Sequence, residues 1–285
     1  MRAAIDIGSN SIRLLILTDD GRLFEQSVLE TRLGDGFADG RLHAAAIART
    51  LDALSQFCAR LHELAAEEVI LFATSAVRDA ENREELLTAA RSELGQSIRV
   101  LSGEEEADYA FRGAVGGFDF APEECLLIDI GGGSTEVAVC PNGHPHGVSV
   151  PMGAVRYKVT AAQPAAVRAL LTDKLSALPA PDTCHVIGVG GTITTAAAIL
   201  YAVTDYSRAA VHGRTIDRPQ LAALTARLAA LTEAERKSVI GLPPARSDII
   251  LYGLDILAVL FDLFQIEKLH VSDHGILDGI LREKA

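Results

Sequence analysis

Two segments of this chain share one pattern, and this internal repeat constrains the possible folds more than any other feature. Each segment has an apolar run that contains an Asp near its end, a turn rich in Gly and Ser, and a second apolar run. The segments are residues 4–14 (AIDIGSNSIRL) and residues 127–137 (LIDIGGGSTEV). The pattern predicts a strand, a tight turn and a strand, with the Asp at the tip of the first strand. Such a repeat indicates a duplicated domain with a phosphate site between the copies.

The two turns have the composition of phosphate-binding loops. Gly permits a backbone with φ > 0, and successive N–H groups in such a turn can form an anion-binding nest. Ser and Thr hydroxyls add further donors. The alternative is two ordinary hairpins with Gly turns. The predicted phosphate ligands are Gly8, Ser9, Asn10 and Ser11 in the first loop and Gly131, Gly132, Gly133, Ser134 and Thr135 in the second.

The Asp before each turn needs a separate explanation, because a carboxylate repels a phosphate. A divalent cation between the two groups would make the pattern favourable. We therefore expect Asp6 and Asp129 to bind a metal ion, directly or through water.

Length and composition restrict the class of protein. The chain has 285 residues, 49% of them hydrophobic, which is enough for two domains that each have a core. A net charge of −12 argues against nonspecific binding of nucleic acid. No apolar run reaches the length of a membrane span, and a strand begins directly after Met1, so we expect no membrane association and no signal peptide.

The cysteine spacing is typical of a protein in a reducing compartment. No pair has C-x-x-C spacing, which favours reduced thiols in a cytoplasmic protein over a disulfide framework or a zinc site. The four residues are Cys58, Cys125, Cys140 and Cys184.

Hydrophobic periodicity predicts the same order of elements twice. In the first half we expect strands at residues 2–7, 12–18, 22–29, 69–73 and 98–101 and helices at 41–65, 82–93 and from 103. In the second half we expect strands at residues 125–130, 135–140, 146–150, 184–188 and 268–271 and helices at 153–160, 164–177, 190–203, 218–230, 245–264 and 276–281. Three strands followed by alternating helices and strands, in two copies, predict an α/β fold with two mixed sheets on either side of a central cleft.

The boundary between the copies is expected in the Gly, Pro and acidic stretch at residues 116–124. This gives domains at residues 1–120 and 121–285, with the last helix able to pack back on the first domain.

Two further groups are candidate phosphate ligands. Arg78 follows a predicted strand and could bind a phosphate with both arms of its guanidinium, although a surface salt bridge is the alternative. Gly190, Gly191 and Thr192 begin a predicted helix, whose N-terminus is a ready site for an anion or a nucleotide. The alternative is tight packing of strand on helix. Arg32 and Arg246 are weaker candidates of the same kind, and His212 is expected to be structural.

Eight segments in order resemble the exopolyphosphatase and guanosine pentaphosphate phosphohydrolase family, within the superfamily of actin, sugar kinases and 70-kDa heat-shock chaperones. They are AIDIGSNSIRLLI, TRLGDGF, ATSAVRDAEN, LSGEEEA, IDIGGGSTE, GVGGTITTAAA, VHGRTI and VSDHGILDGI. The resemblance implies two RNase H-like domains, a magnesium requirement, removal of terminal phosphates from polyphosphate or guanosine pentaphosphate, and a possible homodimer.

The resemblance also implies roles for two glutamates. Glu106 matches the catalytic Glu, which orients the attacking water; the alternative is a helix-capping acid, with Glu105 as the second choice for catalysis. Glu136 matches a carboxylate that binds magnesium or assists the water; the alternative is a solvent-facing strand residue. The equivalent position in the first repeat is Arg13, which suggests that the two loops have different tasks.

The chain resembles the short, two-domain members of that family, with some departures. His274 stands where Trp is commoner, and residues 277–279 (Leu-Asp-Gly) replace a usual Arg-Glu-Gly. We expect a magnesium-dependent exopolyphosphatase that acts on short chains. The alternatives are a guanosine pentaphosphate phosphohydrolase, a small-molecule kinase and a non-catalytic nucleotide switch.

Overall fold

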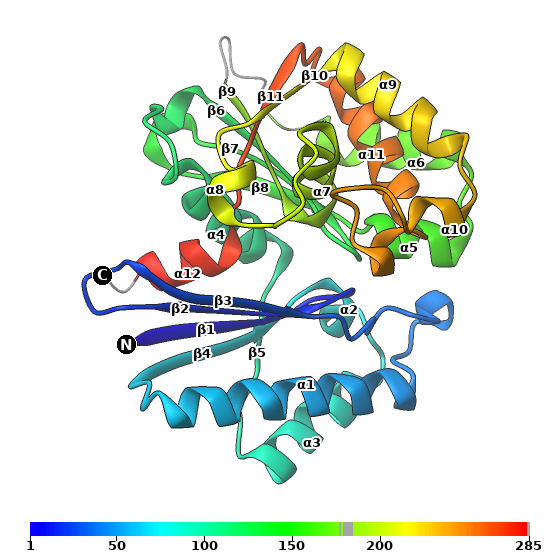
Figure 1. Ribbon diagram of the computed structural model, residues 1–285. Coiled ribbons are helices and arrows are strands. Elements are labelled where there is room, and N and C mark those ends of the chain that lie inside the picture. Colours follow the sequence, from blue (N-terminus) through cyan, green and yellow to red (C-terminus); the bar gives the residue numbers. More distant parts are fainter. Residues whose placement is uncertain (177, 179–184, 284–285) are drawn as a thin grey trace.

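The computed structural model describes residues 1–176, 178 and 185–283, and it has two lobes that are each built on one mixed sheet (Figure 1). The first lobe contains strands β1 to β5 and the second contains β6 to β11. The α/β architecture with two mixed sheets that the sequence predicts is therefore confirmed. No helix in the described ranges is long and apolar enough to cross a membrane.

The sheet of the first lobe has the strand order β3-β2-β1-β4-β5. β1, β2 and β3 form an antiparallel meander, and β4 and β5 run parallel to β1. Helices α1 (Ala44–Glu63) and α3 (Arg83–Leu94) pack their apolar side chains on the outer face of this sheet (Figure 1). The strands are β1 (Arg2–Ile7), β2 (Ile12–Leu17), β3 (Leu23–Leu29), β4 (Glu68–Ala73) and β5 (Arg99–Val100).

The sheet of the second lobe repeats this arrangement, with the strand order β10-β11-β9-β6-β7-β8. β6, β7 and β8 are the antiparallel meander, and β9 runs parallel to β6. The strands are β6 (Cys125–Ile130), β7 (Thr135–Val139), β8 (His146–Val150), β9 (His185–Val189), β10 (Thr215–Asp217) and β11 (Lys268–Val271). The helices of this lobe are α5 (Ala154–Thr160), α6 (Pro164–Leu175), α7 (Gly190–Leu200), α8 (Arg208–Val211), α9 (Arg218–Ala229), α10 (Glu233–Arg236) and α11 (Ile250–Leu263).

Two helices lie between the sheets, α4 (Gly103–Val115) and α12 (Ile276–Arg282) (Figure 1). Their apolar residues share one buried cluster with Phe72 of the first sheet and Leu127 of the second. The two helices touch through glycines, since a Cβ at Gly279 would lie 1.9 Å from Tyr109 O and one at Gly113 would lie 1.9 Å from Gly275 O. Close helix packing therefore joins the two lobes.

The predicted strands and long helices are present, and the differences are confined to short elements and ends. Within the described ranges, the elements that were not predicted are α2 (Ser75–Arg78), α8, α10, β10 and the short 3₁₀ helices Phe37–Asp39, Pro122–Glu124 and Pro141–Gly143. The helix predicted at 245–264 begins only at Ile250, because Pro243 and Pro244 favour a 3₁₀ turn over Pro244–Arg246. The predicted ends of the helix at residue 177 and of the strand at Cys184 lie outside the described residues.

Candidate active site

A cavity of about 440 Å³ opens between the two lobes. Both predicted phosphate loops line it, together with three of the predicted carboxylates and the start of α7. The sequence-predicted lining residues are 8–11, 131–134 and 190–192, with Glu106, Asp129 and Glu136. The remaining predicted site residues also lie in the described ranges, but they do not line the cavity: Asp6, Arg78 and Thr135. The fold therefore brings most candidates from both repeats to one place.

The first loop has its carbonyl groups held away from the cavity. The N–H of Gly8 donates to Ser11 O at 3.0 Å and closes the turn. The carbonyl of Ser9 accepts from Gly34 N at 2.7 Å, and that of Asn10 accepts from Arg32 N at 2.9 Å. Because a peptide unit is planar and trans, a carbonyl that points one way sends the next N–H the other way. The N–H groups of residues 10 and 11 therefore point away from the 31–36 loop, and neither they nor the N–H of residue 9 has a protein acceptor within the described chain.

The second loop has the same construction with different partners. The N–H of Gly131 donates to Ser134 O at 3.0 Å. The carbonyl of Gly131 accepts from Ala154 N at 3.0 Å, and that of Gly132 accepts from the first-turn N–H groups of α5, at 2.8 Å from residue 155 and 3.0 Å from residue 156. Among the described residues, the N–H groups of positions 132–134 have no protein acceptor. Both loops thus present unpaired amides, as an anion-binding nest requires.

Thr135 differs from the rest of its loop. It lies at the start of β7, is fully buried, and its hydroxyl donates to Met152 O at 2.6 Å. The hydroxyl is therefore engaged in holding the loop against the segment that follows β8.

The residue opposite each Asp differs between the repeats, as the sequence suggested. In the first sheet Asp6 faces Arg13 across β1 and β2, and Arg13 Nε donates to Asp6 Oδ2 at 2.8 Å. In the second sheet Asp129 faces Glu136 across β6 and β7. Glu136 is 1% exposed and accepts from Ser149 Oγ at 2.6 Å. The first repeat has an ion pair where the second has two carboxylates, so Glu136 is not a solvent-facing residue.

Glu106 lies on the buried face of α4 and points toward the cavity, not toward the helix end. The capping is done by Glu105, whose carboxylate accepts from Ser102 N at 2.8 Å while Ser102 Oγ accepts from Glu105 N at 3.1 Å. The alternative interpretation of Glu106 as the capping acid is therefore wrong. Glu106 Oε2 accepts instead from Arg78 Nη1 at 2.6 Å. Arg78, a predicted phosphate ligand, thus lies behind Glu106 as its counter-ion.

Three carboxyl groups of the cavity have raised pKa values. Burial raises the pKa of Glu106 to about 7 against the opposing charge of Arg78, with a smaller rise from Asp6 and Asp129. Burial also raises the pKa of Asp129 to about 6, against the charge of Arg13. Burial and the neighbouring Glu106 and Asp129 raise the pKa of Glu136 well above its usual value. Carboxyl groups perturbed together in one cleft are typical of functional sites.

Three carboxylates of the two repeats, Asp6, Asp129 and Glu136, are suitable ligands for a divalent cation. The side-chain oxygen Oδ1 of Asp6 is buried without a hydrogen-bond partner among the described residues. Asp129 and Glu136 lie opposite each other on β6 and β7, and the negative charges of neighbouring carboxylates raise the pKa of each, so a cation between these groups would stabilise their ionised forms. No three His, Cys, Asp or Glu side chains in the described ranges converge as a ready metal cage. Magnesium needs no such cage, since it commonly binds one or two carboxylates and completes its shell with water and substrate phosphate.

The raised pKa values predict how stability depends on pH. Protonation of Glu106 and Asp129 favours the folded state, because their folded pKa values of about 7 and 6 exceed the ordinary 4.5 and 3.8. This contribution is complete below about pH 4 and is lost as pH rises through 6 and 7. Without metal, we expect the melting temperature to fall between pH 5.5 and pH 8, and added Mg²⁺ to raise it more at pH 8, because the metal needs ionised carboxylates.

A variant separates this effect from other titrations. Burial lowers the pKa of His212 and His270, which gives the opposite pH trend. The Glu136→Gln variant removes one carboxylate from the cluster and should flatten the fall in melting temperature. Scanning calorimetry in chelator at several pH values measures it, and a melting temperature that rises between pH 5.5 and pH 8 in both proteins would contradict the interpretation.

The glycines at the start of α7 are needed for packing around the cavity. Gly190 has φ +86°, and a Cβ there would lie 2.4 Å from Asp129 Oδ1. A Cβ at Gly191 would lie 1.6 Å from Arg246 Nη1. Tight packing of strand on helix, which was the alternative explanation of this motif, is therefore present at Gly190, and Asp129 and Arg246 lie beside the helix N-terminus.

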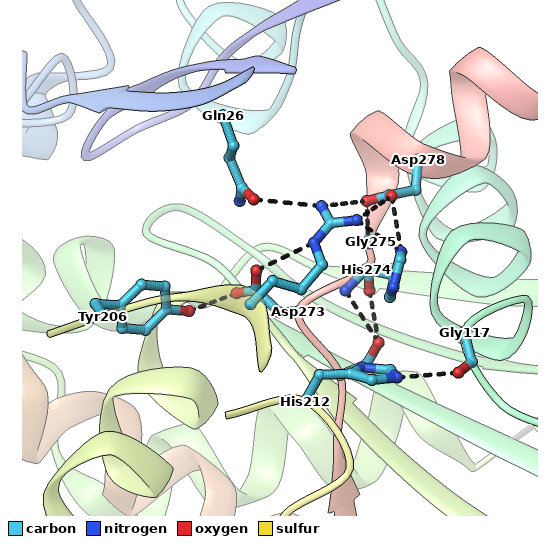
Figure 2. A network of polar contacts seen from close by, with 10 residues as sticks. Gln26, Gly117, Tyr206, His212, Asp273, His274, Gly275 and Asp278 are labelled. Carbon is cyan, nitrogen blue, oxygen red and sulfur yellow. Dashed lines mark hydrogen bonds and ion pairs between the residues drawn. The ribbon is translucent and has the colours of Figure 1, made fainter. Parts of the chain in front are cut away.

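Another wall of the cavity holds a polar network that the sequence did not predict. Arg208 donates from Nη1 to Asp278 Oδ1 at 2.8 Å and from Nη2 to Asp278 Oδ2 at 3.3 Å. It also donates to Gln26 Oε1 of the first lobe at 3.3 Å, and its Nε lies 3.5 Å from Asp273 Oδ2 (Figure 2). The two carboxylates neutralise Arg208. His274 Nδ1 lies 2.8 Å from Asp278 Oδ1, so two of the departures seen in the sequence lie in this wall.

Comparison with known proteins identifies relatives along nearly the whole chain. A sequence model of the Ppx/GppA phosphatase family matches residues 23–285. Exopolyphosphatase 2 of Mycobacterium tuberculosis is 34% identical over 98% of this chain and 96% of its own length. Guanosine-5'-triphosphate,3'-diphosphate pyrophosphatase of Aeromonas salmonicida is 28% identical over 98% of this chain and 58% of its own length.

Solved structures agree with these relationships. An exopolyphosphatase-like protein is 28% identical, covers 99% of this chain with 98% of its own, and superposes with a TM-score of 0.91. The Ppx/GppA protein of Aquifex aeolicus is 30% identical, covers 99% of this chain with 96% of its own, and has a TM-score of 0.80. The shared sequence, the shared fold and the two Gly-rich loops that line one cavity lead to one conclusion: the chain belongs to the Ppx/GppA phosphatase family.

Proposed function

We propose that this protein is a magnesium-dependent exopolyphosphatase that removes the terminal phosphate from short chains of inorganic polyphosphate. As a family member it is a phosphoanhydride hydrolase. The observation that supports the proposal most is the position of the unpaired amides of both Gly-rich loops, which line the same cavity as Glu106. The loops hold phosphate groups, and the carboxylate beside them activates water.

The loops and Glu106 have different roles in the proposed reaction. Amides of residues 9–11 and 132–134 bind the terminal phosphates and stabilise the negative charge that the transition state spreads over their oxygens. Glu106 orients a water molecule and accepts its proton, for which a pKa of about 7 suits a reaction near neutral pH. The water oxygen bonds to the terminal phosphorus, the anhydride bond breaks, and the shortened chain leaves.

Asp6, Asp129 and Glu136 are the proposed magnesium ligands, directly or through water. Phosphatases of this family are generally metal-dependent. The ion would supply positive charge that offsets the charge of the phosphates and the carboxylates. Arg78 keeps Glu106 in place, and Ser149 keeps Glu136 in place, through the hydrogen bonds described above.

The electrostatics of the cleft favour a short substrate. The net charge of the chain is −12, and Arg208, which lines the cavity, is neutralised by Asp273 and Asp278. A long polyanion therefore meets no continuous cationic surface there. Guanosine pentaphosphate is the second candidate, because a cavity of about 440 Å³ lies within the size range that holds nucleotide-sized ligands.

The direct test is phosphate release by the purified protein with Mg²⁺, offered separately short polyphosphate, long polyphosphate, guanosine pentaphosphate and ATP. Release from short polyphosphate is the expected result, and preference for guanosine pentaphosphate would select the second candidate. ATP turnover that depends on an added acceptor would indicate a small-molecule kinase, and tight nucleotide binding without turnover would indicate a switch.

Three further predictions stay open to experiment. We place the domain boundary at residues 120 and 121, in the Gly, Pro and acidic stretch of residues 116–124, although α4, which precedes this stretch, packs on the second sheet. We also propose a cytoplasmic location and allow for a homodimer. Limited proteolysis tests the domain boundary, and sedimentation measures the oligomeric state.

A further inference from the structure

One side chain, Arg156 of α5, contacts both the second phosphate loop and the first lobe, and the mechanism above gives it no task. Its Nε donates to Gly133 O at 2.7 Å in the second lobe. Its Nη2 donates to Ser75 Oγ at 3.0 Å and to Asp79 Oδ2 at 2.5 Å, and both acceptors belong to the segment at α2 of the first lobe. The side chain of Arg156 is 17% exposed, so these bonds are largely shielded from water.

The bond to Gly133 completes the construction of the loop. Backbone N–H groups of α5 hold the carbonyls of Gly131 and Gly132, and the side chain of Arg156 holds the third carbonyl, that of Gly133. The planar trans peptide then directs the N–H of Ser134 the opposite way. Arg156 therefore fixes the peptide that carries the last unpaired amide of the nest.

The lobes meet at this same point. A Cβ at Gly133 would lie 2.4 Å from Ser9 Oγ and 2.6 Å from Ser75 Oγ, so the second loop touches the first lobe directly. The guanidinium of Arg156 also lies 5.2 Å from the ring centroid of Phe37 in the first lobe. If the lobes separate, Arg156 loses Ser75, Asp79 and Phe37 together, and of its polar partners among the described residues only Gly133 O remains.

We propose that Arg156 is a positioning residue that orients the Gly133–Ser134 peptide toward substrate phosphate when the two lobes are closed. This inference rests on the phosphate-binding role proposed above for the second loop. The planar guanidinium can serve both lobes at once because Nε and Nη2 lie on one edge of the fork. Lysine has a single ammonium and cannot reproduce this geometry.

The experiment compares Arg156→Gln, Arg156→Lys and the unmodified protein. A control, Arg168→Lys, changes another arginine that pairs with a carboxylate, Asp262 at 2.6 Å, on a helix that does not line the cavity. We expect kcat/KM to fall by about 10²-fold in Arg156→Gln and by a similar factor in Arg156→Lys, since a displaced binding group is costly to the transition state. The control should keep the kcat/KM of the unmodified protein.

Binding of inorganic phosphate with Mg²⁺, measured by calorimetry, separates positioning from a merely structural role. We expect the dissociation constant for phosphate to rise about tenfold in Arg156→Gln, a change of about 1.4 kcal/mol. This measurement needs no turnover. A lower melting temperature with unchanged phosphate affinity would overturn the inference, and so would a failure of the unmodified protein to bind phosphate.

A double-mutant cycle tests the link to the first lobe. If Asp79 acts only by holding Arg156, the variant with Arg156→Gln and Asp79→Asn should bind phosphate no more weakly than Arg156→Gln alone. Additive losses in this cycle would refute the link between lobes. If the Arg156 variants change the phosphate affinity as expected but the unmodified protein hydrolyses none of the substrates, the proposed function is wrong while the role of Arg156 stands.

Discussion

The Glu106→Gln variant is expected to release phosphate with a kcat lower by about 10²-fold or more, the usual scale for the loss of a general base. Gln has nearly the shape of Glu, and its side-chain oxygen can still accept a hydrogen bond from Arg78, which donates to Glu106 Oε2 at 2.6 Å in the native site. What the amide cannot do is take a proton from water. KM should change little, because the phosphate-binding amides of both loops are untouched.

Glu105→Gln is the matched control. Glu105 precedes Glu106 on the same helix, but its carboxylate caps α4 and pairs with Arg99 on the surface. This variant should melt at a slightly lower temperature and keep its kcat. Phosphate release at the native rate by Glu106→Gln, or an equal loss in both variants, would show that Glu106 is not the base.

The second large effect is expected from Gly279→Ala, which should reduce the free energy of unfolding by about 3 kcal/mol. Alanine normally stabilises a helix relative to glycine by about 1 kcal/mol. Here the added Cβ would lie 1.9 Å from Tyr109 O and 2.7 Å from the carbonyl carbon, so α12 must move away from α4. Since each kcal/mol corresponds to roughly 2–4 °C in a chain of this order of size, calorimetry should show a melting temperature roughly 10 °C lower.

The control for this substitution lies on the same segment. Gly275 has nothing within 4 Å of an added Cβ, and its φ of −155° suits any residue. Gly275→Ala should therefore leave the melting temperature unchanged. A Gly279→Ala protein as stable as the unmodified one would mean that α12 and α4 do not pack as closely as described.

Sequence periodicity was enough to predict the duplicated sheets, because β1 and β2, and likewise β6 and β7, are short and largely apolar runs joined by a turn rich in Gly and Ser. It could not separate the tasks of Glu105 and Glu106. Both are acidic residues in the first turn of α4, and only the helix phase decides that Glu105 faces Ser102 while Glu106 faces the cavity. The short elements α8 and β10 have no periodic pattern and are fixed by tertiary contacts, such as the pairing of β10 with β11.

Side-chain contacts between the two lobes could not be predicted from a sequence pattern for a similar reason. Arg156 and Asp79 are separated by 77 positions, and Arg208 and Gln26 by 182. Nothing near either arginine in the sequence indicates a partner, since the pairing arises only when two separately built sheets face each other. The Gly-rich loops were predictable because their ligands are local backbone amides, whose geometry depends on neighbouring residues.

The place of α12 between the sheets has a consequence for the order of folding. Strand β1 begins at Arg2, yet its inner face shares a buried cluster with Ile276 and Ile280, and Arg2 Nη1 donates to Leu281 O at 3.1 Å. During synthesis, this face of β1 is therefore covered by α12 only after residues about 275 positions later have been made. Contacts of such long sequence separation form late, so the nascent first lobe exposes an apolar sheet face for most of translation. Protection of that face from aggregation is a requirement that this topology places on the cell.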